Sequence, residues 1–218
     1  VEGLLKMSND SALGAPITFT GLPSGAWFGE GTLLKREHYR YNIEALRAST
    51  VAGLPIAVAF FRALDPAMEI EVLVAEGAQV PPGTDLMRLS GNARAMLTAE
   101  RSALNTVQHL SGIATLTRTY VEAMQGQATL LDTRKTIPGL RHLEKYATRM
   151  GGAQNHRMGL WDAAMIKDNH VLVAGGVAEA VRRARAAGVK DIICEVDHLK
   201  QIEPALAAGA SHLLLDNM

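Results

Sequence analysis

The sequence predicts an α/β fold in which a partial (β/α) barrel of parallel strands follows a small α+β sandwich domain and a β-rich N-terminal segment. From residue 128 onward, short apolar runs alternate with amphipathic helical patterns, as in parallel strands joined by crossover helices. The apolar runs end in charged side chains, as barrel strands do at the face that carries an active site. We therefore expect a β-rich segment at 1–50, an α+β domain at 51–112 and the barrel domain at 113–218.

Composition restricts the class of protein. The 218 residues, 48% of them hydrophobic, suffice for an ordinary domain with a sizeable core and for a small second domain. The formal net charge is +0, which argues against a protein that binds nucleic acid or a membrane surface, because phosphate-rich surfaces attract a basic excess. The positive charge is local, which favours a small anionic substrate.

Several features predict a cytoplasmic location. A single cysteine, Cys194, excludes a disulfide framework and fits a reducing compartment. No apolar run reaches the roughly 20 residues of a membrane span, and no signal peptide is recognisable. The start at Val1 suggests that further residues precede it in the complete protein.

Residues 16–50 alternate apolar and polar side chains around glycine-rich turns, the pattern of a small antiparallel β-roll. The piece GAWFGEGTLLKREHYRYNIEALRAS resembles the cyclic-nucleotide-binding fold of catabolite-activator-like regulators. That resemblance would place Gly29 and Glu30 in a phosphate-binding cassette and would make Arg40 the contact to a cyclic phosphate. Two residues after that arginine the family usually has a small residue, whereas this chain has Asn42, and no helix-turn-helix follows. An inert β segment is therefore the favoured interpretation.

Residues 51–91 have the pattern of a small α+β unit. Apolar residues at helical spacing predict a helix over 51–64, which Pro66 ends. Alternating apolar and charged residues predict a half-buried strand over 68–74, and a Pro-Pro-Gly turn leads to a second strand over 85–91. We interpret these elements as scaffold.

A long helical pattern covers residues 92–124, and we expect two helices divided near Ser111 and Gly112. One stripe of this pattern, at steps of three and four residues, contains Leu97, Arg101, Leu104, Gln108 and Ser111. A lone arginine beside apolar residues can extend its charged end to solvent, so periodicity alone favours a structural role for Arg101.

Strands and helices alternate regularly over the rest of the chain. Strands are expected at 128–136, 163–170, 191–197 and 211–218, and helices at 138–150, 177–188 and 199–210, the last interrupted at Pro204. Parallel strands joined in this way curl into part of a barrel. A barrel closes only when all its strands are present, so we expect the chain to cover about half of one.

Charged side chains gather at the C-terminal ends of these strands. The earlier strands end in Arg134, Lys135 and Lys167, and the later ones in Glu195 and Asp216. Arginine presents a planar pair of donors to a carboxylate, so the cations favour a substrate with carboxylate groups. The acidic residues suit Mg²⁺ or sugar hydroxyls. The alternative is that cations and acids neutralise one another in structural salt bridges.

Other common chemistries have weaker signals. The sequence contains no HExxH, no Cys/His pattern at zinc spacing, and no GxxxxGK or GxGxxG loop. Gly175 and Gly176 before a helix are a weak phosphate-binding signal. Cys194 lies within an apolar run, which favours a core position over a role as nucleophile.

Four motifs stand out in the barrel region: DTRKTIPGLR, GGAQNHRMGL, MIKDNH and LLLDNM. Together with the helical segment LTAERSALNTVQHLSGIATLTR, they closely resemble quinolinate phosphoribosyltransferase, and the resemblance covers residues 51–218. The family is a pentosyltransferase that joins quinolinate to phosphoribosyl pyrophosphate. It releases pyrophosphate and CO₂ and gives nicotinate mononucleotide, a step of NAD biosynthesis. The resemblance implies this reaction and these two substrates for the chain.

The resemblance also implies roles for individual residues. Arg134, His156 and Arg157 would grip the quinolinate carboxylates. Lys135 and Lys167 would add positive charge for the substrate and for pyrophosphate. A site with about five cations offsets the charge of a dianion and can align its ring nitrogen with the sugar carbon.

By the same resemblance, Glu195 and Asp216 would face the ribose and hold Mg²⁺, and with Lys135 and Lys167 they form the expected catalytic set. The motif AERSALN would place Arg101 in the active site of a neighbouring subunit. That implication overrides the structural role suggested by periodicity. It predicts a homodimer or a higher homo-oligomer with shared active sites.

Two departures from the family are expected to matter. The family's N-terminal segment is replaced up to a junction near Thr50 and Val51, and its later strands are absent after Met218, so the chain resembles a chimera or a fragment. The alternatives are therefore a nucleotide-sensing binding module, a catalytically inactive fragment of the transferase, and a transport-operon paralogue with another substrate. The intact NHRMG and KDNH motifs disfavour the paralogue.

Overall fold

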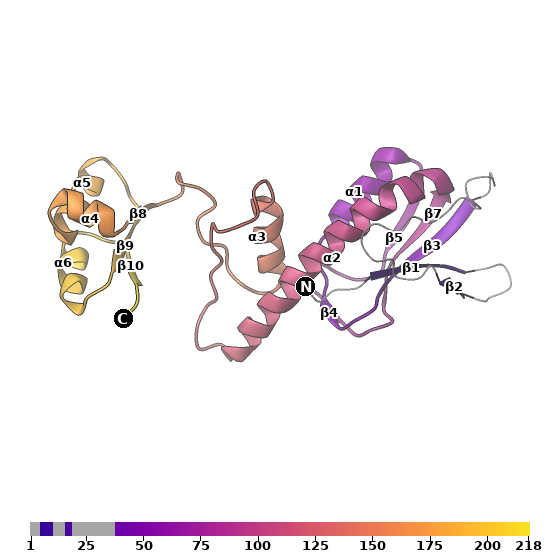
Figure 1. The fold of residues 1–218 in the computed structure, drawn as a ribbon, viewed down its shortest axis with the longest axis horizontal. Helices are drawn as coiled ribbons and strands as arrows, with labels where there is room; N and C mark the ends of the chain where they lie inside the picture. The colour runs from indigo at the N-terminus through magenta and orange to yellow at the C-terminus, as the bar shows by residue number, and fades with distance from the viewer. Residues whose placement is uncertain (1–4, 11–15, 19–37) are drawn as a thin grey trace. The chain divides into compact units, whose positions relative to one another are not determined.

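The computed structural model describes residues 5–10, 16–18 and 38–218 (Figure 1), so the predicted cassette residues Gly29 and Glu30 lie outside the described part. The chain divides into two compact units, residues 1–155 and residues 156–218. Each unit has a hydrophobic core of its own. The α/β class predicted from the sequence is confirmed.

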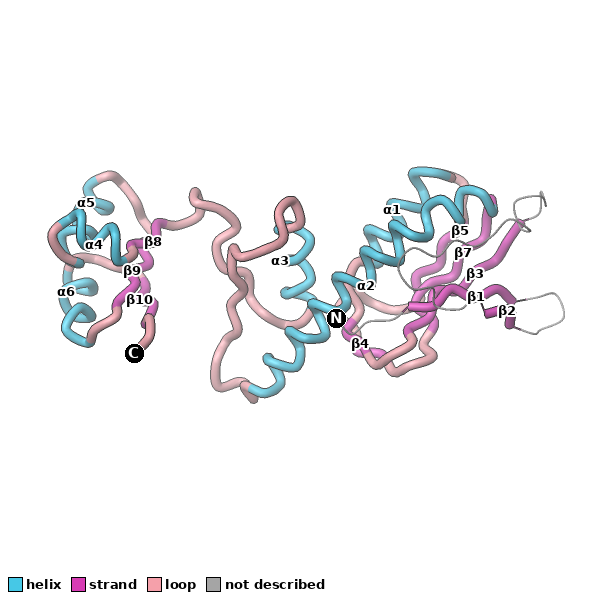
Figure 2. The backbone as a smooth tube through the Cα atoms, viewed as in Figure 1, coloured by secondary structure: helices cyan, strands magenta, loops and turns pink. Residues whose placement is uncertain are grey.

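The first unit is built on a five-stranded antiparallel sheet with the order β2-β1-β3-β7-β5 (Figure 2). Its strands are β1 (Leu5–Asp10), β2 (Pro16–Thr18), β3 (His38–Ala45), β5 (Glu69–Val72) and β7 (Asp85–Asn92), and β4 (Ser49–Thr50) pairs separately with β6 (Gln79–Val80). β3 pairs with β7 along most of its length, so the sheet continues across residue 50, where a domain boundary was expected. Tyr41, Ile43 and Ala45 are buried and the residues between them are half-buried, as in a strand with one covered face.

Two helices, α1 (Leu54–Leu64) and α2 (Ala93–Ala123), pack side by side in the first unit (Figure 1). α1 confirms the helix expected before Pro66. Phe61 from α1, Met96 from α2 and Met87 from β7 belong to one core cluster and are fully buried. Burial of each such side chain contributes about 1.5–3 kcal/mol relative to its exposed state, so this cluster fixes both helices on the sheet.

α2 is one continuous helix, so the predicted division near Ser111 and Gly112 is wrong. Contacts from outside the helix outweigh the local sequence preference. Ser111 Oγ accepts from the Ala52 amide at 3.0 Å and donates to the Ala52 carbonyl at 3.2 Å. One turn later, Thr115 Oγ1 accepts from the Thr50 amide at 2.8 Å. These bonds hold the middle of α2 against β4.

Residues 128–136 do not form the predicted strand, although the structure describes all of them. They contribute an isolated parallel bridge between Leu131 and Gln154. The chain then turns, and the Lys135 amide donates to Thr133 Oγ1 at 3.0 Å. A hydroxyl that captures a nearby amide in this way competes with sheet pairing at that position.

α3 (Arg141–Met150) confirms the amphipathic helix expected in this part of the chain. Its Ala147 is fully buried in a cluster with Leu110 and Ala114 of α2. The two helices approach closely at Gly151, because a Cβ there would lie 2.6 Å from the Ala114 carbonyl oxygen. α3 is thereby fixed to the first unit.

The second unit confirms the predicted parallel sheet, with the order β10-β9-β8. Its strands are β8 (Ala164–Ile166), β9 (Ile192–Val196) and β10 (His212–Leu215), and its helices are α4 (Asp168–Ala174), α5 (Val177–Ala186), the 3₁₀ turn η1 (Leu199–Gln201) and α6 (Ile202–Ala207). Val181 of α5, Ile192 of β9 and Ala205 of α6 are fully buried in one cluster. The crossover helices therefore cover the sheet as expected.

Two predicted boundaries in this unit are wrong. The strand expected over 163–170 ends at Ile166, because α4 begins at Asp168. The Lys167 amide donates to His170 Nδ1 at 2.9 Å and so closes the first turn of α4. Pro204 does not interrupt α6; it lies in the first turn, where its missing amide costs no hydrogen bond.

Candidate active site

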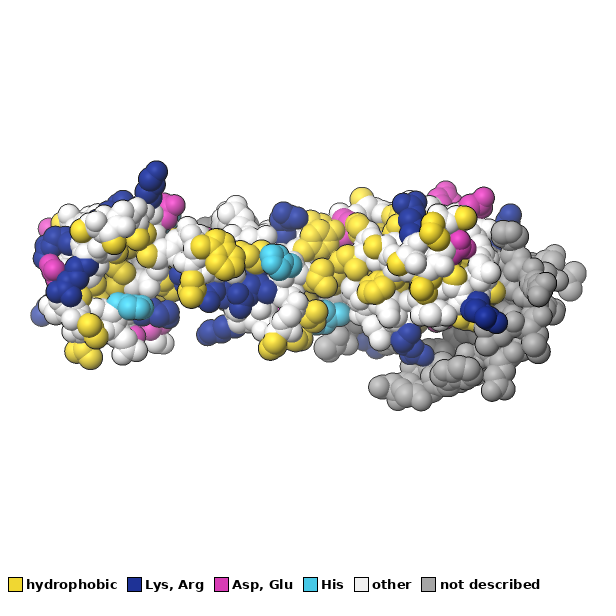
Figure 3. Space-filling view, turned by 90° about the horizontal axis from the view of Figure 1, so that it is seen from above, with side chains coloured by type: hydrophobic (Ala, Val, Ile, Leu, Met, Phe, Trp, Pro, Cys, Tyr) yellow, Lys and Arg dark blue, Asp and Glu magenta, His cyan; other side chains and the backbone are white. Residues whose placement is uncertain are grey.

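The predicted site residues fall in both units. Arg101, Arg134 and Lys135 belong to the first unit, and His156, Arg157, Lys167, Glu195 and Asp216 belong to the second. Lys and Arg side chains lie on the surface of each unit rather than on one alone (Figure 3), in keeping with the balanced net charge. Among the described helices, none combines the length and the apolar character that a membrane crossing requires.

Three of these residues lie at the C-terminal edge of the parallel sheet. Lys167 directly follows β8, Glu195 is on β9, and Asp216 directly follows β10. Lys167 Nζ lies 3.1 Å from Glu195 Oε2 and 3.3 Å from Oε1. The Asp216 amide donates to the Val196 carbonyl at 2.9 Å, which anchors its backbone beside β9. The edge predicted from the sequence therefore carries a cation and two carboxylates.

The ion pair at this edge is only partly shielded from solvent. The Glu195 side chain is 16% exposed, whereas that of Lys167 is 50% exposed. A carboxylate removed from water needs a compensating charge, which Lys167 supplies. The salt-bridge alternative raised from the sequence applies to this pair, and the exposed part of the ammonium remains accessible to an anionic ligand.

Cys194 precedes Glu195 on β9 and is fully buried. Burial raises the pKa of the Cys194 thiol, and the neighbouring Glu195 carboxylate raises it further. The thiol therefore stays protonated at neutral pH, and a protonated thiol is a poor nucleophile. Its predicted core position is confirmed.

Glu195 and Asp216 were also predicted to hold Mg²⁺. In the part of the chain that the structure describes, no group of three or more His, Cys, Asp or Glu side chains is placed to hold a metal ion. Mg²⁺ commonly keeps several waters and binds through one or two carboxylates together with substrate phosphates. Two carboxylates on neighbouring strands fit that mode of binding.

The loop that follows His156 holds the Arg157 guanidinium. Arg157 Nη1 donates to the Ala163 carbonyl at 3.0 Å, and Nη2 lies 3.3 Å from Met165 Sδ. Both His156 and Arg157 are half-buried. The Arg157 side chain is therefore fixed to the segment that leads into β8.

In the first unit, Arg134 and Lys135 follow the bridge residue Leu131. Lys135 is exposed and Arg134 is half-buried. Arg134 Nε is buried and has no hydrogen-bond partner among the described residues. Buried donors are nearly always paired, and a ligand carboxylate would supply the partner that an arginine prefers.

The partners of Asp132 that position this segment were missed from the sequence. Asp132 forms a buried ion pair with Lys145 and accepts hydrogen bonds from Thr148 Oγ1 at 3.2 Å and Asn155 Nδ2 at 2.6 Å. A signal was present, because polar residues recur at the spacing of one helix face: Arg141, Glu144, Lys145 and Thr148. The sequence pattern alone does not distinguish such a face from a solvated one.

Arg101 and Arg40 both occupy exposed positions, the first on α2 and the second on β3. Burial raises the pKa of the Glu100 carboxyl, and the neighbouring Arg101 partly offsets that rise. The predicted role of Arg40 at a cyclic phosphate stays a prediction.

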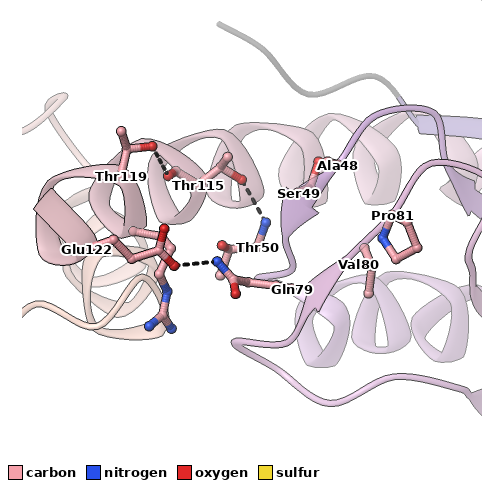
Figure 4. Close-up of a pocket in the computed structure, with 10 residues that line it drawn as sticks. Ala48, Ser49, Thr50, Gln79, Val80, Pro81, Thr115, Thr119 and Glu122 are labelled. Carbon is pink, nitrogen blue, oxygen red and sulfur yellow. Dashed lines mark hydrogen bonds between the residues drawn. The ribbon is translucent and has the colours of Figure 1, made fainter.

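A shallow pocket of about 310 Å³ lies between β4, β6 and α2 (Figure 4). Two hydrogen bonds cross it: Gln79 Nε2 donates to Glu122 Oε1 at 2.8 Å, and the Thr50 backbone amide donates to Thr115 Oγ1 at 2.8 Å. The predicted site residues do not line it. The pocket is therefore distinct from the candidate active site.

Family models match nearly all of the chain. Residues 17–111 match the quinolinate phosphoribosyl transferase N-terminal domain, and residues 113–218 match the C-terminal domain of the same enzyme. The first match begins well upstream of residue 51, so the likeness extends further than the motifs in the sequence indicated. It includes β3, which pairs with β7 in the same sheet.

Individual relatives agree with these matches. The probable nicotinate-nucleotide pyrophosphorylase (carboxylating) of Synechocystis sp. is 48% identical over 197 residues, which cover 89% of this chain and 66% of the relative. The enzyme of that name from Mycobacterium leprae is 50% identical over 147 residues, which cover 66% of this chain and 51% of the relative. The chain thus spans about half to two thirds of the length of these relatives.

Solved structures give the same result. The nicotinate-nucleotide pyrophosphorylase from Francisella tularensis matches with a TM-score of 0.81 and 38% identity, covering 89% of this chain and 71% of that chain. The enzyme from Ehrlichia chaffeensis matches with a TM-score of 0.78 and 33% identity, covering 86% of this chain and 69% of that chain. Sequence and structure together show that the chain belongs to the quinolinate phosphoribosyltransferase family.

Proposed function

We propose that the protein transfers the phosphoribosyl group of phosphoribosyl pyrophosphate to quinolinate and decarboxylates the product. The products are nicotinate mononucleotide, pyrophosphate and CO₂, so the reaction is a step of NAD biosynthesis. The observation that carries the proposal is the buried Nε of Arg134, which has no hydrogen-bond partner among the described residues. Arg134 lies in the cation-containing segment DTRKT, within the part of the chain that matches the family's C-terminal domain. Such a donor suits a carboxylate of the substrate.

Quinolinate is a dianion, and the candidate residues offer it several cations. Arg134, His156 and Arg157 are assigned to its two carboxylates. Lys135 and Lys167 have exposed side chains and are assigned to the remaining charge of the substrate and to pyrophosphate. Fixing both substrates in one geometry replaces a bimolecular encounter with an oriented one, which lowers the entropic part of the barrier.

The bond changes balance without a protein nucleophile. The lone pair of the quinolinate ring nitrogen forms the bond to the anomeric carbon of the ribose, and the bond from that carbon to pyrophosphate breaks with its electron pair on the leaving oxygen. Lysine ammonium groups stabilise the charge that develops there. The ring nitrogen is now cationic and accepts the electron pair left when the adjacent carboxylate departs as CO₂, after which a proton takes its place.

Glu195 and Asp216 are the residues proposed to hold Mg²⁺ together with substrate phosphate oxygens. When bound, the ion supplies Lewis-acid neutralisation of the pyrophosphate charge. Lys167 contributes positive charge to the same end from the protein, because its side chain is half exposed and its ammonium lies beside Glu195.

We further propose a homodimer or higher homo-oligomer, in which Arg101 of one subunit completes the site of another, and a cytoplasmic location. The exposed position of Arg101 on α2 supports the first proposal, and the single cysteine supports the second. The nucleotide-sensing alternative is not favoured, because the N-terminal family match reaches back to residue 17.

The proposal is tested by calorimetric titration with quinolinate, in the presence and absence of Mg²⁺ and phosphoribosyl pyrophosphate. We expect Arg134→Ala to weaken quinolinate binding by roughly a hundredfold, because hydrogen bonds between charged groups contribute up to about 3 kcal/mol. Arg88→Ala is the matched control, since Arg88 is an exposed arginine of β7 paired with Glu71 at 3.4 Å. Unchanged binding in a folded Arg134→Ala variant would contradict the proposal.

A further inference from the structure

α3 has two faces with different partners. The apolar face packs on α2, with Ala147 fully buried and with Leu143 and Met150 packed against the same cluster. The other face carries four polar side chains at the spacing i, i+3, i+4 and i+7, namely Arg141, Glu144, Lys145 and Thr148. These polar side chains bond to the segment that bears Arg134 and Lys135.

The first contact is made at the start of that segment. The Lys145 ammonium and the Asp132 carboxylate form an ion pair in which the side chains are 1% and 4% exposed. Asp132 Oδ2 also accepts from Thr148 Oγ1 at 3.2 Å and from Asn155 Nδ2 at 2.6 Å. Asn155 Nδ2 in turn donates to the Lys145 carbonyl at 2.8 Å. The ion pair therefore joins α3 to Asp132, and the hydrogen bonds of Asn155 join both to the residue that precedes His156.

Further contacts follow along the segment. Arg141 Nη2 donates to the Arg134 carbonyl at 3.3 Å, and Arg141 Nε donates to Thr136 Oγ1 at 3.3 Å. Glu144 Oε2 accepts from the Ile137 amide at 3.1 Å. The polar face of α3 thus holds the segment on both sides of Arg134 and Lys135.

The burial of Lys145 in an ion pair does not by itself indicate a stabilising role. Replacing a buried ion pair with apolar residues is often neutral or stabilising, so such a pair is weak evidence for a stabilising function. Groups that bind a small anion must be held close to one geometry, and packed neighbouring residues supply that restraint. The apolar face of α3 already attaches the helix to α2, so the pair is not needed to hold the helix itself.

We propose that Lys145 and Asp132 are positioning residues, which fix the backbone of residues 132–137 on α3 so that Arg134 and Lys135 are held in place for an anionic substrate. The identity of that substrate rests on the proposed function. The restraint on the segment does not, and it is measurable without any ligand.

The test uses the double variant Asp132→Asn/Lys145→Met, which removes both charges together. A single Lys145→Met change would leave a buried carboxylate unpaired and could unfold the protein. The matched control is Tyr146→Phe, which removes a hydrogen bond from the next residue of α3 to Glu76 and leaves the segment's contacts intact. Amide hydrogen exchange and calorimetric titration with quinolinate are measured on the same preparations.

In the double variant we expect the amides of residues 132–137 and of Asn155 to exchange about tenfold faster or more, while those of β7 and α1 are unchanged. Quinolinate affinity should fall by about tenfold or more, because small misplacements of binding groups are costly. Tyr146→Phe should leave the exchange of residues 132–137 and the quinolinate affinity at the wild-type level, because it does not touch the segment's contacts.

The outcomes separate the two proposals. Unchanged exchange in the segment of a folded double variant overturns the positioning role. Faster exchange throughout the protein also overturns it, since that result describes a general loss of stability. A third outcome is possible: exchange in the double variant is faster only in the segment, and the wild type does not bind quinolinate. That result supports the positioning role and excludes quinolinate as the substrate.

Discussion

Lys167 and Glu195 form an ion pair across the ends of two adjacent parallel strands, with Nζ 3.1 Å from Oε2. Lys167→Met should weaken quinolinate binding by about tenfold or more, because a charge-assisted contact contributes about 1.5–3 kcal/mol. The free energy of unfolding should also fall, by about 1–2 kcal/mol, because the Glu195 carboxylate is only 16% exposed and loses its compensating charge. Calorimetry and thermal unfolding measure the two quantities.

The exposed Lys200 of η1 provides the control for this prediction. Lys200→Met removes the same charge from the same unit and should alter neither quantity. Equal losses of binding in both variants would mean that net charge, rather than the place of Lys167, determines affinity.

Glu76 ties the start of α1 to α3. Its carboxylate accepts from the Gly53 amide at 2.8 Å and the Leu54 amide at 2.7 Å, and Tyr146 donates to it as well. Glu76→Ala should lower the free energy of unfolding by about 2–3 kcal/mol, because it leaves amides at the helix start without their acceptor.

Tyr146→Phe removes a single hydrogen bond from the same cluster and should lower the free energy of unfolding by about 1 kcal/mol. Denaturant titration gives both values. A smaller loss in Glu76→Ala than in Tyr146→Phe would contradict the assignment of Glu76 as the acceptor for the start of α1.

Gly151 is required by packing and Gly126 by backbone conformation. A Cβ at Gly151 would lie 2.5 Å from Thr117 Cβ and 2.6 Å from the Ala114 carbonyl oxygen, so Gly151→Ala must separate α3 from α2. We expect a loss of about 2–3 kcal/mol in unfolding free energy from this overpacking. Gly126 has a φ of 74°, and a Cβ at this position would meet nothing within 4 Å, so Gly126→Ala should cost only about 1 kcal/mol. Thermal unfolding measures both losses, and a larger loss of stability in Gly126→Ala than in Gly151→Ala would refute this distinction.

Cys194 should make stability depend on pH at the alkaline end. Burial, followed by the neighbouring Glu195, raises the pKa of its thiol in the folded protein above the ordinary value of 9.0. Above about pH 9 the unfolded thiol loses its proton while the folded thiol keeps it, so the free energy of unfolding falls as pH rises. This contribution is fully present below about pH 9.

Denaturant titrations of wild type and Cys194→Ala between about pH 7 and 11 isolate this contribution. The difference between the two proteins should be constant up to about pH 9 and should shrink above it. A difference that stays constant over the whole range would show that the thiol titrates alike in the folded and unfolded states.

Strong local patterns predicted much of the fold. The helical spacing that precedes Pro66 corresponds to α1, and the apolar run that ends in Glu195 corresponds to β9. The rule that parallel strands end at one edge correctly placed Lys167 beside Glu195. These features depend on neighbouring residues or on topology, and both can be inferred from the sequence.

The features that were missed depend on contacts between distant residues. α2 continues through Ser111 because Ala52, 59 positions earlier, bonds to that side chain. Lys145 is buried because Asp132 lies opposite it, and a sequence pattern cannot distinguish that position from an exposed lysine. The strand expected over 128–136 is replaced by a turn whose amide bonds to a nearby hydroxyl.

The hydroxyls of α2 also affect how this protein can meet another chain. One edge of β4 pairs with β6, and on its other side the amides of Thr50 and of Ala52, two residues after the strand, bond to Thr115 and Ser111. A strand edge with free amides is a template for pairing with a foreign strand and hence for aggregation. Here two side chains, one helical turn apart, take up the donors that a foreign strand would need. The helix therefore protects the edge of β4 without contributing a strand to it.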